Sequence, residues 1–133
     1  MPSEIRLQRI ADRLKKELSE MLIFDLEDPR VQGIYVTDVN VDRELAYANI
    51  YVSAVEGSTR AEEVLAGLES ASGYIRRTLA GRVDLRTFPQ LRFYWDPTPE
   101  KAEHIEEILA EIREEEAQRN ENDSEEVNEE AEE

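Results

Sequence analysis

Between residues 46 and 54, apolar and polar residues alternate strictly, and this alternation constrains the fold more than any other feature of the sequence. A period of two is that of a β-strand with one buried face. One face consists of Ala46, Ala48, Ile50, Val52 and Ala54, and the other of Tyr47, Asn49, Tyr51 and Ser53. Because alanine fills little space, the alanines on the apolar face predict that a helix packs closely against this strand.

A second strand precedes this one, and the two are expected to form a hairpin over residues 33–55. Ile34 and Val36 alternate in one phase, whereas Val39 and Val41 alternate in the opposite phase. A β-bulge between the two pairs absorbs such a change, because it adds one residue to one strand.

Helical spacing of apolar residues predicts most of the remaining elements. A first helix over residues 5–24 has its apolar stripe at Leu7, Ile10, Leu14, Leu18 and Met21. Apolar residues between 61 and 79 keep the same spacing, but the small residues Ala71-Ser72-Gly73 lie among them and predict a kink between two helices. A third strand follows, in which apolar residues alternate at positions 91, 93 and 95. Thr98-Pro99 is then a typical helix start, with a capping hydroxyl before a proline.

The order of elements is helix, strand, strand, helix, kink, helix, strand, helix. It predicts a single α+β domain with a three-stranded sheet packed on helices. With 133 residues and 40% hydrophobic content, the chain has enough apolar surface for one modest core. We expect the domain, with its C-terminal helix, to cover residues 1–118. Residues 119–133 have no apolar periodicity, so we expect them to form a disordered acidic tail.

The formal net charge of −16 is distributed unevenly along the chain. Residues 1–97 contain 13 Lys/Arg and 16 Asp/Glu, whereas residues 98–133 contain 3 Lys/Arg and 16 Asp/Glu. The first part is therefore close to charge balance, which leaves room for a local basic face. A local face governs the encounter with nucleic acid more than the total charge does.

Several classes of function find no support in the sequence. The chain has no cysteine, which excludes a disulfide framework, a thiolate metal site and a cysteine nucleophile. Its single histidine, His104, lies among glutamates, where a solvated side chain is the ordinary role. No phosphate-binding glycine motif occurs, and no apolar run approaches the ~18 residues of a membrane span. We expect no catalysis, no metal or other cofactor, no small-molecule substrate, no membrane association and a cytoplasmic location.

The kink and the basic residues around it give the best support for a binding function. Gly73 tolerates unusual backbone angles, and a helix that begins there would present free N–H groups and a positive dipole end to a phosphate. The alternative, which the residues leave open, is a bend or a crowded packing site flanked by surface arginines. A second basic row lies on the first helix, opposite its apolar stripe. The candidate RNA-binding residues are Ala71, Ser72, Gly73, Arg76, Arg77, Arg82, Arg86, Arg6, Arg9, Arg13 and Lys16.

Six segments carry a likeness to a known family. They are RIADRLKKELSEML (9–22), DPR (28–30), VTDVNVDREL (36–45), ANIYVS (48–53), SASGYIRRTLAGRVDLRTFPQLRFYWD (70–96) and PEKAEHIEEIL (99–109). In this order and spacing the chain resembles the ribosome-binding factor A family of bacterial small-subunit assembly factors. The likeness covers roughly residues 5–112 without a large gap.

The resemblance implies a type II KH-like fold and an RNA-binding role. KH domains carry a GxxG loop that clamps nucleic-acid backbone, and the resemblance implies that the Ala71-Ser72-Gly73 kink replaces that loop, with Arg76 and Arg77 facing ribosomal RNA. It also implies binding to free small ribosomal subunits, near the 5′ end and decoding region of their rRNA, and a part in late maturation and rRNA processing. We expect a monomer. The alternative function is a protein-binding adaptor that uses the exposed sheet face.

Overall fold

The structure is a computed structural model that describes residues 3–132, with side chains described through Asp123. Residues up to Pro97 form one compact unit, and helix α3 (Thr98–Glu132) forms another. Met1, Pro2 and Glu133 lie outside the described residues. The division of the chain into a domain of residues 1–118 and a tail of residues 119–133 stays a prediction.

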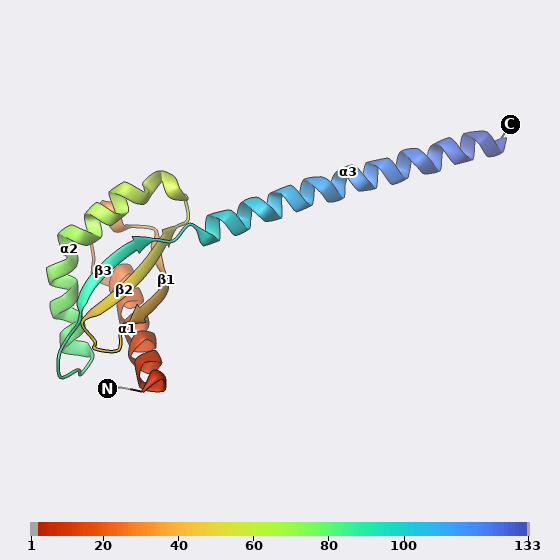
Figure 1. The fold of residues 1–133 in the computed structure, drawn as a ribbon. Helices are drawn as coiled ribbons and strands as arrows, with labels where there is room; N and C mark the ends of the chain where they lie inside the picture. Colours follow the sequence, from red (N-terminus) through yellow and green to blue (C-terminus); the bar gives the residue numbers. More distant parts are fainter. Residues whose placement is uncertain (1–2, 133) are drawn as a thin grey trace. The chain divides into compact units, whose positions relative to one another are not determined.

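The sheet consists of β1 (Ile34–Val41), β2 (Tyr47–Ala54) and β3 (Gln90–Trp95), in the order β1-β2-β3 (Figure 1). Strands β1 and β2 are antiparallel, whereas β2 and β3 are parallel. The register of the first pair shifts between Val36 and Asp38, so the predicted bulge is confirmed. Leu45 has a positive φ of 56°, in the tight turn that joins the two antiparallel strands.

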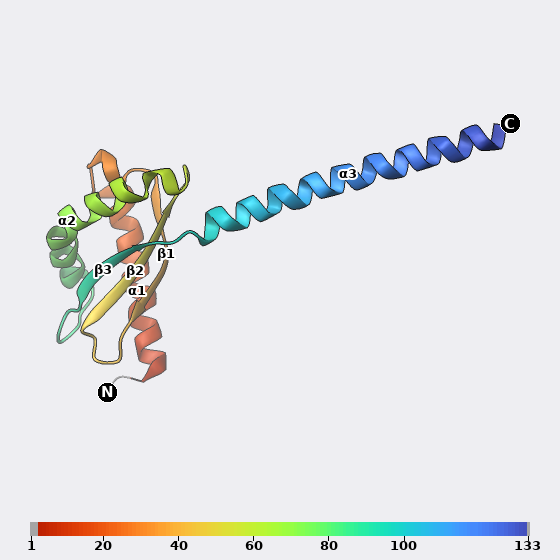
Figure 2. The ribbon, with the colours of Figure 1, turned by 45° about the horizontal axis from the view of Figure 1, so that its top comes forward.

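Helices α1 (Glu4–Phe24) and α2 (Ala61–Arg82) cover the same face of the sheet (Figures 1 and 2). Ala48 and Ile50 of β2 are at most 1% exposed, and they belong to the same core as Leu18 of α1 and Leu68 of α2. The predicted α+β arrangement of a three-stranded sheet packed on helices is confirmed. Ala46 is the exception among the predicted buried alanines, because it lies before β2 and is exposed.

A close backbone approach occurs at Gly67 of α2. A Cβ on Gly67 would lie 2.9 Å from both Arg30 Cβ and Val31 Cγ1, in the short 3-10 helix Pro29–Val31. Asp28 caps this short helix, and hydrogen bonds from the Arg30 side chain and backbone hold the pKa of Asp28 below its ordinary value. The crowded packing that the sequence allows at Gly73 therefore occurs at Gly67, more than one turn earlier.

Helix α2 is continuous from Ala61 to Arg82, where the sequence predicts two helices separated by a kink. The helix bends along its length instead of breaking (Figures 1 and 2). The Ser72 hydroxyl donates to the Glu69 carbonyl oxygen at 2.8 Å. Side-chain bonds of this kind to the preceding turn often accompany helix bending, because they compete with the backbone donors. The predicted break is thus corrected to a bend within one helix.

Helix α3 continues through Glu132, past the predicted helix end at Gln118. The side chains of residues 101–123 are all exposed. The backbone of residues 119–132 is helical, where the sequence predicts disorder. A helix without a packed face is marginal in water, so disorder of this segment in solution stays a prediction. None of the described helices combines the length and the apolarity that a membrane crossing requires.

Candidate nucleic-acid interface

Four predicted basic residues lie along the outer face of α1. They are all outside the core, whereas the opposite side of the helix is buried against the sheet; they are Arg6, Arg9, Arg13 and Lys16. Among the residues whose side chains are described, through Asp123, no partner forms a hydrogen bond or ion pair with the side chains of Arg6, Arg9 and Lys16. These three cations are therefore available to an external anion.

Arg13 and Arg82 join α1 to the end of α2. An Arg13 guanidinium nitrogen donates to the Arg82 carbonyl oxygen at 3.4 Å. Both arginines also pair with the largely buried Glu17, at 3.3 Å from Arg13 and 3.9 Å from Arg82, and Arg82 bonds Asp25 at 2.8 Å. These pairs neutralise part of the positive charge of both arginines. They also link the basic row of α1 to the C-terminal end of α2.

The Arg76 side chain is half-buried and has partners within the protein, and its predicted contact with RNA stays a prediction. It donates to the carbonyl oxygen of Phe88 at 2.8 Å and to that of Pro89 at 3.2 Å. Its guanidinium carbon also lies 5.7 Å from the centroid of the Phe88 ring. Arg76 therefore fastens the loop before β3 to α2, and it offers less to a phosphate than its sequence position indicates.

Gly73 and Arg77 are exposed, whereas Ala71 and Ser72 are half-buried. A Cβ on Gly73 would meet only Arg77 Nη1 within 4 Å, at 3.8 Å. This finding argues against the packing explanation for Gly73, because nothing crowds that position. Arg77 and Arg86 have exposed side chains, and neither forms an ion pair or hydrogen bond with any residue of the described chain. Of the predicted arginines at and after the bend, Arg76 and Arg82 have partners within the protein, whereas Arg77 and Arg86 have none among the described residues.

Sequence reasoning missed Tyr74, which is 46% exposed beside Gly73. It lies three residues before Arg77, so the two side chains are neighbours on the helix surface. An aromatic residue at this spacing from an arginine, outside the apolar stripe of the helix, is the signal that could have identified it.

The sheet face opposite the helices carries a group of tyrosines. Tyr51 and Tyr94 stack with their ring centroids 5.4 Å apart, and the Arg92 guanidinium lies 3.3 Å from the centroid of Tyr47. Tyr35 is 40% exposed on the same face. Tyr47 and Tyr94 are also exposed on this face, whereas Tyr51 is half-buried, and Arg92 is engaged there.

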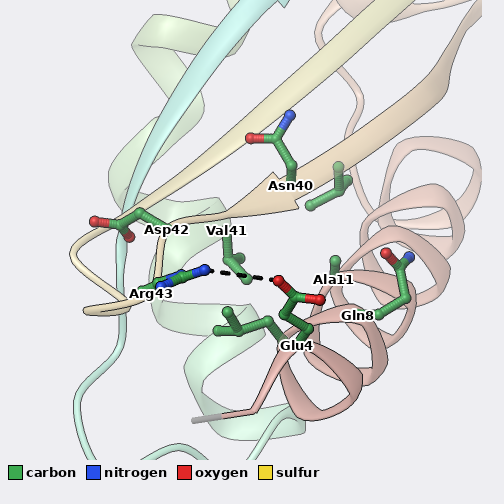
Figure 3. A pocket seen from close by; sticks show the side chains of 9 residues that line it. Glu4, Gln8, Ala11, Asn40, Val41, Asp42 and Arg43 are labelled. Atoms are coloured by element: carbon green, nitrogen blue, oxygen red, sulfur yellow. Dashed lines mark ion pairs between the residues drawn. The ribbon is translucent and has the colours of Figure 1, made fainter. Parts of the chain in front are cut away.

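A pocket of about 300 Å³ lies between the N-terminal half of α1 and the end of β1. Arg43 and Glu4 form an ion pair of 3.6 Å across it (Figure 3). Both side chains are mostly solvent-exposed, so the pair contributes little stability. The pocket is lined by none of the eleven candidate residues. Among the residues that the structure describes, no group of His, Cys, Asp and Glu is arranged to hold a metal ion.

Comparison with known proteins gives consistent matches along most of the chain. The sequence profile of the family described as Ribosome-binding factor A matches residues 6–109. Ribosome-binding factor A of Alcanivorax borkumensis is 42% identical over 112 residues, which cover 81% of this chain and 80% of the relative. The protein of the same name from Clostridioides difficile is 39% identical over 125 residues, which cover 93% of this chain and 98% of the relative.

Solved structures agree with these sequence matches. The crystal structure of ribosome-binding factor A from Thermus thermophilus has a TM-score of 0.61 at 29% identity, over 67% of this chain and 93% of that chain. A homology model of the Thermus thermophilus factor, fitted into a cryo-EM map of its complex with the 30S subunit, has a TM-score of 0.52 at 31% identity. That match covers 62% of this chain and 87% of the other. The structures of these factors have a KH-like fold, which confirms the predicted fold class.

Proposed function

Because this chain belongs to the ribosome-binding factor A family, we propose that it binds free small ribosomal subunits in the bacterial cytoplasm. It contacts small-subunit rRNA near the 5′ end and the decoding region, and assists late subunit maturation and rRNA processing. It acts as a monomer by binding alone, without catalysis, cofactor or small-molecule substrate. The homology model of the Thermus thermophilus factor, fitted into a cryo-EM map of its 30S complex, supports the choice of the small subunit as the partner.

The observation that carries the RNA-binding part is the set of unpaired cations on the body. Arg6, Arg9 and Lys16 on α1, with Arg77 and Arg86, lie at the surface and have no carboxylate partner among the described residues. Phosphate groups are the partners that such cations bind in RNA, and the contacts position the protein without reading sequence. Both sets of cations belong to the one compact unit that ends at Pro97, and contacts of Arg13 and Arg82 link the α1 row to the end of α2.

A specific observation also favours a second candidate function, a protein-binding adaptor. The sheet face opposite the helices presents Tyr35, Tyr47 and Tyr94, which are 40%, 38% and 40% exposed, together with Arg92. Tyrosine and arginine are enriched in protein–protein interfaces. The adaptor function requires this face, whereas RNA binding requires the cations of α1 and α2.

Co-sedimentation with purified ribosomal subunits separates the two candidates. We expect the parent chain to co-sediment with free small subunits and not with large subunits or with translating ribosomes. Arg9→Ala combined with Lys16→Ala should weaken this binding, while Arg92→Ala, the matched control on the sheet face, should not. Equal binding to large subunits, or a loss with Arg92→Ala alone, would contradict the proposal.

A further inference from the structure

Tyr74 is a large aromatic residue that lies outside the hydrophobic core. It is 46% exposed on α2, although the next residue, Ile75, is completely buried. Among the side chains that the structure describes, its ring pairs with no other aromatic ring or guanidinium, and its hydroxyl has no hydrogen-bond partner. The packing of the body therefore gives no reason for an aromatic side chain at this position.

The surface beside Tyr74 has open space above the backbone of Gly73. The preceding residue is Gly73, and a Cβ there would have no neighbour within 4 Å except Arg77 Nη1 at 3.8 Å. The Arg77 guanidinium thus lies beside the Gly73 backbone, one turn back along the helix. Gly73, Tyr74 and Arg77 together present a bare stretch of backbone, an aromatic ring and a free guanidinium on one exposed turn.

We propose that this turn binds one unpaired nucleotide of RNA, with the Tyr74 ring stacked on the base and Arg77 on the adjoining phosphate. Stacking on tyrosine requires an exposed base face, and bases expose their faces only where they are unpaired. Arg77 supplies the positive charge that binds the phosphate adjoining the stacked base. The inference rests on the proposed RNA-binding function, and it adds that this site takes single-stranded RNA and rejects a duplex.

The charges near Tyr74 fix the direction of the contact. Glu69 is exposed about one turn before Gly73, on the N-terminal side, where it repels a phosphate. Arg76 is held by the carbonyl oxygens of Phe88 and Pro89. The free positive charge is that of Arg77, on the C-terminal side of the ring, so the phosphate lies on that side.

The test is equilibrium binding of the full chain to a labelled oligoadenylate of about 12 nucleotides, and to a duplex of the same length. Tyr74→Leu should weaken binding to the oligoadenylate by about fivefold or more, because leucine removes the stacking face. Tyr74→Phe keeps that face and should stay within about twofold of the parent. Tyr35, a tyrosine of the sheet face, is 40% exposed, so Tyr35→Leu is the matched control and should have no effect. Melting curves of each variant check that the fold is intact.

Salt dependence separates stacking from charge. Tyr74→Leu should leave the slope of log affinity against log salt unchanged, since it removes no phosphate contact, whereas Arg77→Ala should reduce it by about 0.7. The inference is overturned if Tyr74→Leu binds the oligoadenylate like the parent, or if Tyr74→Phe loses as much as Tyr74→Leu. A parent chain that binds small-subunit rRNA and the duplex but not the oligoadenylate also overturns it, and leaves the proposed function standing. A parent chain that binds no small-subunit rRNA overturns the proposed function itself.

Discussion

The guanidinium of Arg76 donates a hydrogen bond of 2.8 Å to the carbonyl oxygen of Phe88 and lies 5.7 Å from the centroid of the same residue's ring. A second bond reaches the Pro89 carbonyl oxygen at 3.2 Å. The two adjacent arginines of α2 therefore have different roles. Arg76 holds the loop that leads into β3, whereas the exposed Arg77 side chain has no hydrogen bond or ion pair with the described residues.

Replacement of each arginine by alanine should separate these roles. Arg76→Ala leaves two loop carbonyl oxygens without their charged donor, so we expect the free energy of unfolding to fall by roughly 1–3 kcal/mol. Arg77→Ala should change it by no more than about 0.5 kcal/mol, because its side chain is exposed and unpaired in the described structure. Urea denaturation of the two variants measures both values. Equal stabilities would contradict the structural role of Arg76.

Alanine at two glycines of α2 should have opposite effects. At Gly67 the new Cβ would lie 2.9 Å from Arg30 Cβ and Val31 Cγ1, so we expect a loss of roughly 1–3 kcal/mol in unfolding free energy. At Gly73 the new Cβ has open space, so the better helix propensity of alanine should add up to about 1 kcal/mol. Thermal unfolding of both variants gives the comparison. A stabilised Gly67→Ala variant would mean that the 3-10 helix Pro29–Val31 is free to move away.

Apart from the break in α2, local periodicity predicted the order of the strands and helices, the bulge between Val36 and Asp38 and the inner face of β2 from Ala48 to Ala54. Each of these features depends on residues near one another in the sequence. The alternation of Ile50 and Val52 with polar residues, for example, requires a strand with one covered face whatever else surrounds it. The KH-like arrangement of the elements came from the resemblance of the ordered segments to a family, not from periodicity.

The roles of the individual candidate residues were less predictable, since they depend on contacts between distant segments. The sequence places Arg76 and Arg77 side by side, but only the packing of the Phe88 loop against α2 distinguishes them. In the same way, Gly67 and Gly73 look alike in the sequence, and only the position of Val31 shows which of them is crowded. The sequence places Tyr74 outside the apolar stripe of α2 and three residues before Arg77, but only the structure shows that its side chain is exposed.

Removal of the acidic segment after Gln118 tests the predicted tail. Residues 101–123 are exposed, so truncation removes little packed surface and should leave the melting temperature of the body unchanged within about two degrees. If the segment is disordered in solution, as the sequence predicts, the far-ultraviolet helical signal per molecule should also stay constant. A clear loss of that signal would show that the helix persists beyond Gln118. A large drop in melting temperature would show that the tail is docked.

The slope of log affinity against log salt measures how many phosphates the basic residues bind. Removing one cation that binds a phosphate should flatten the slope by about 0.7 for single-stranded RNA and about 0.9 for a duplex. Arg9 and Lys16 are without partners among the described residues, so Arg9→Ala and Lys16→Ala should each flatten the slope by one such step and weaken binding. Arg13→Ala should flatten it less and destabilise the fold, because Arg13 pairs with Glu17 and bonds the Arg82 carbonyl oxygen.

The measurement is binding to a small-subunit rRNA fragment at several salt concentrations, with Arg92→Ala as the control. If the slopes of the Arg9 and Lys16 variants equal that of the parent while both variants are folded, the α1 row does not meet phosphate, and the RNA interface must lie elsewhere on the body.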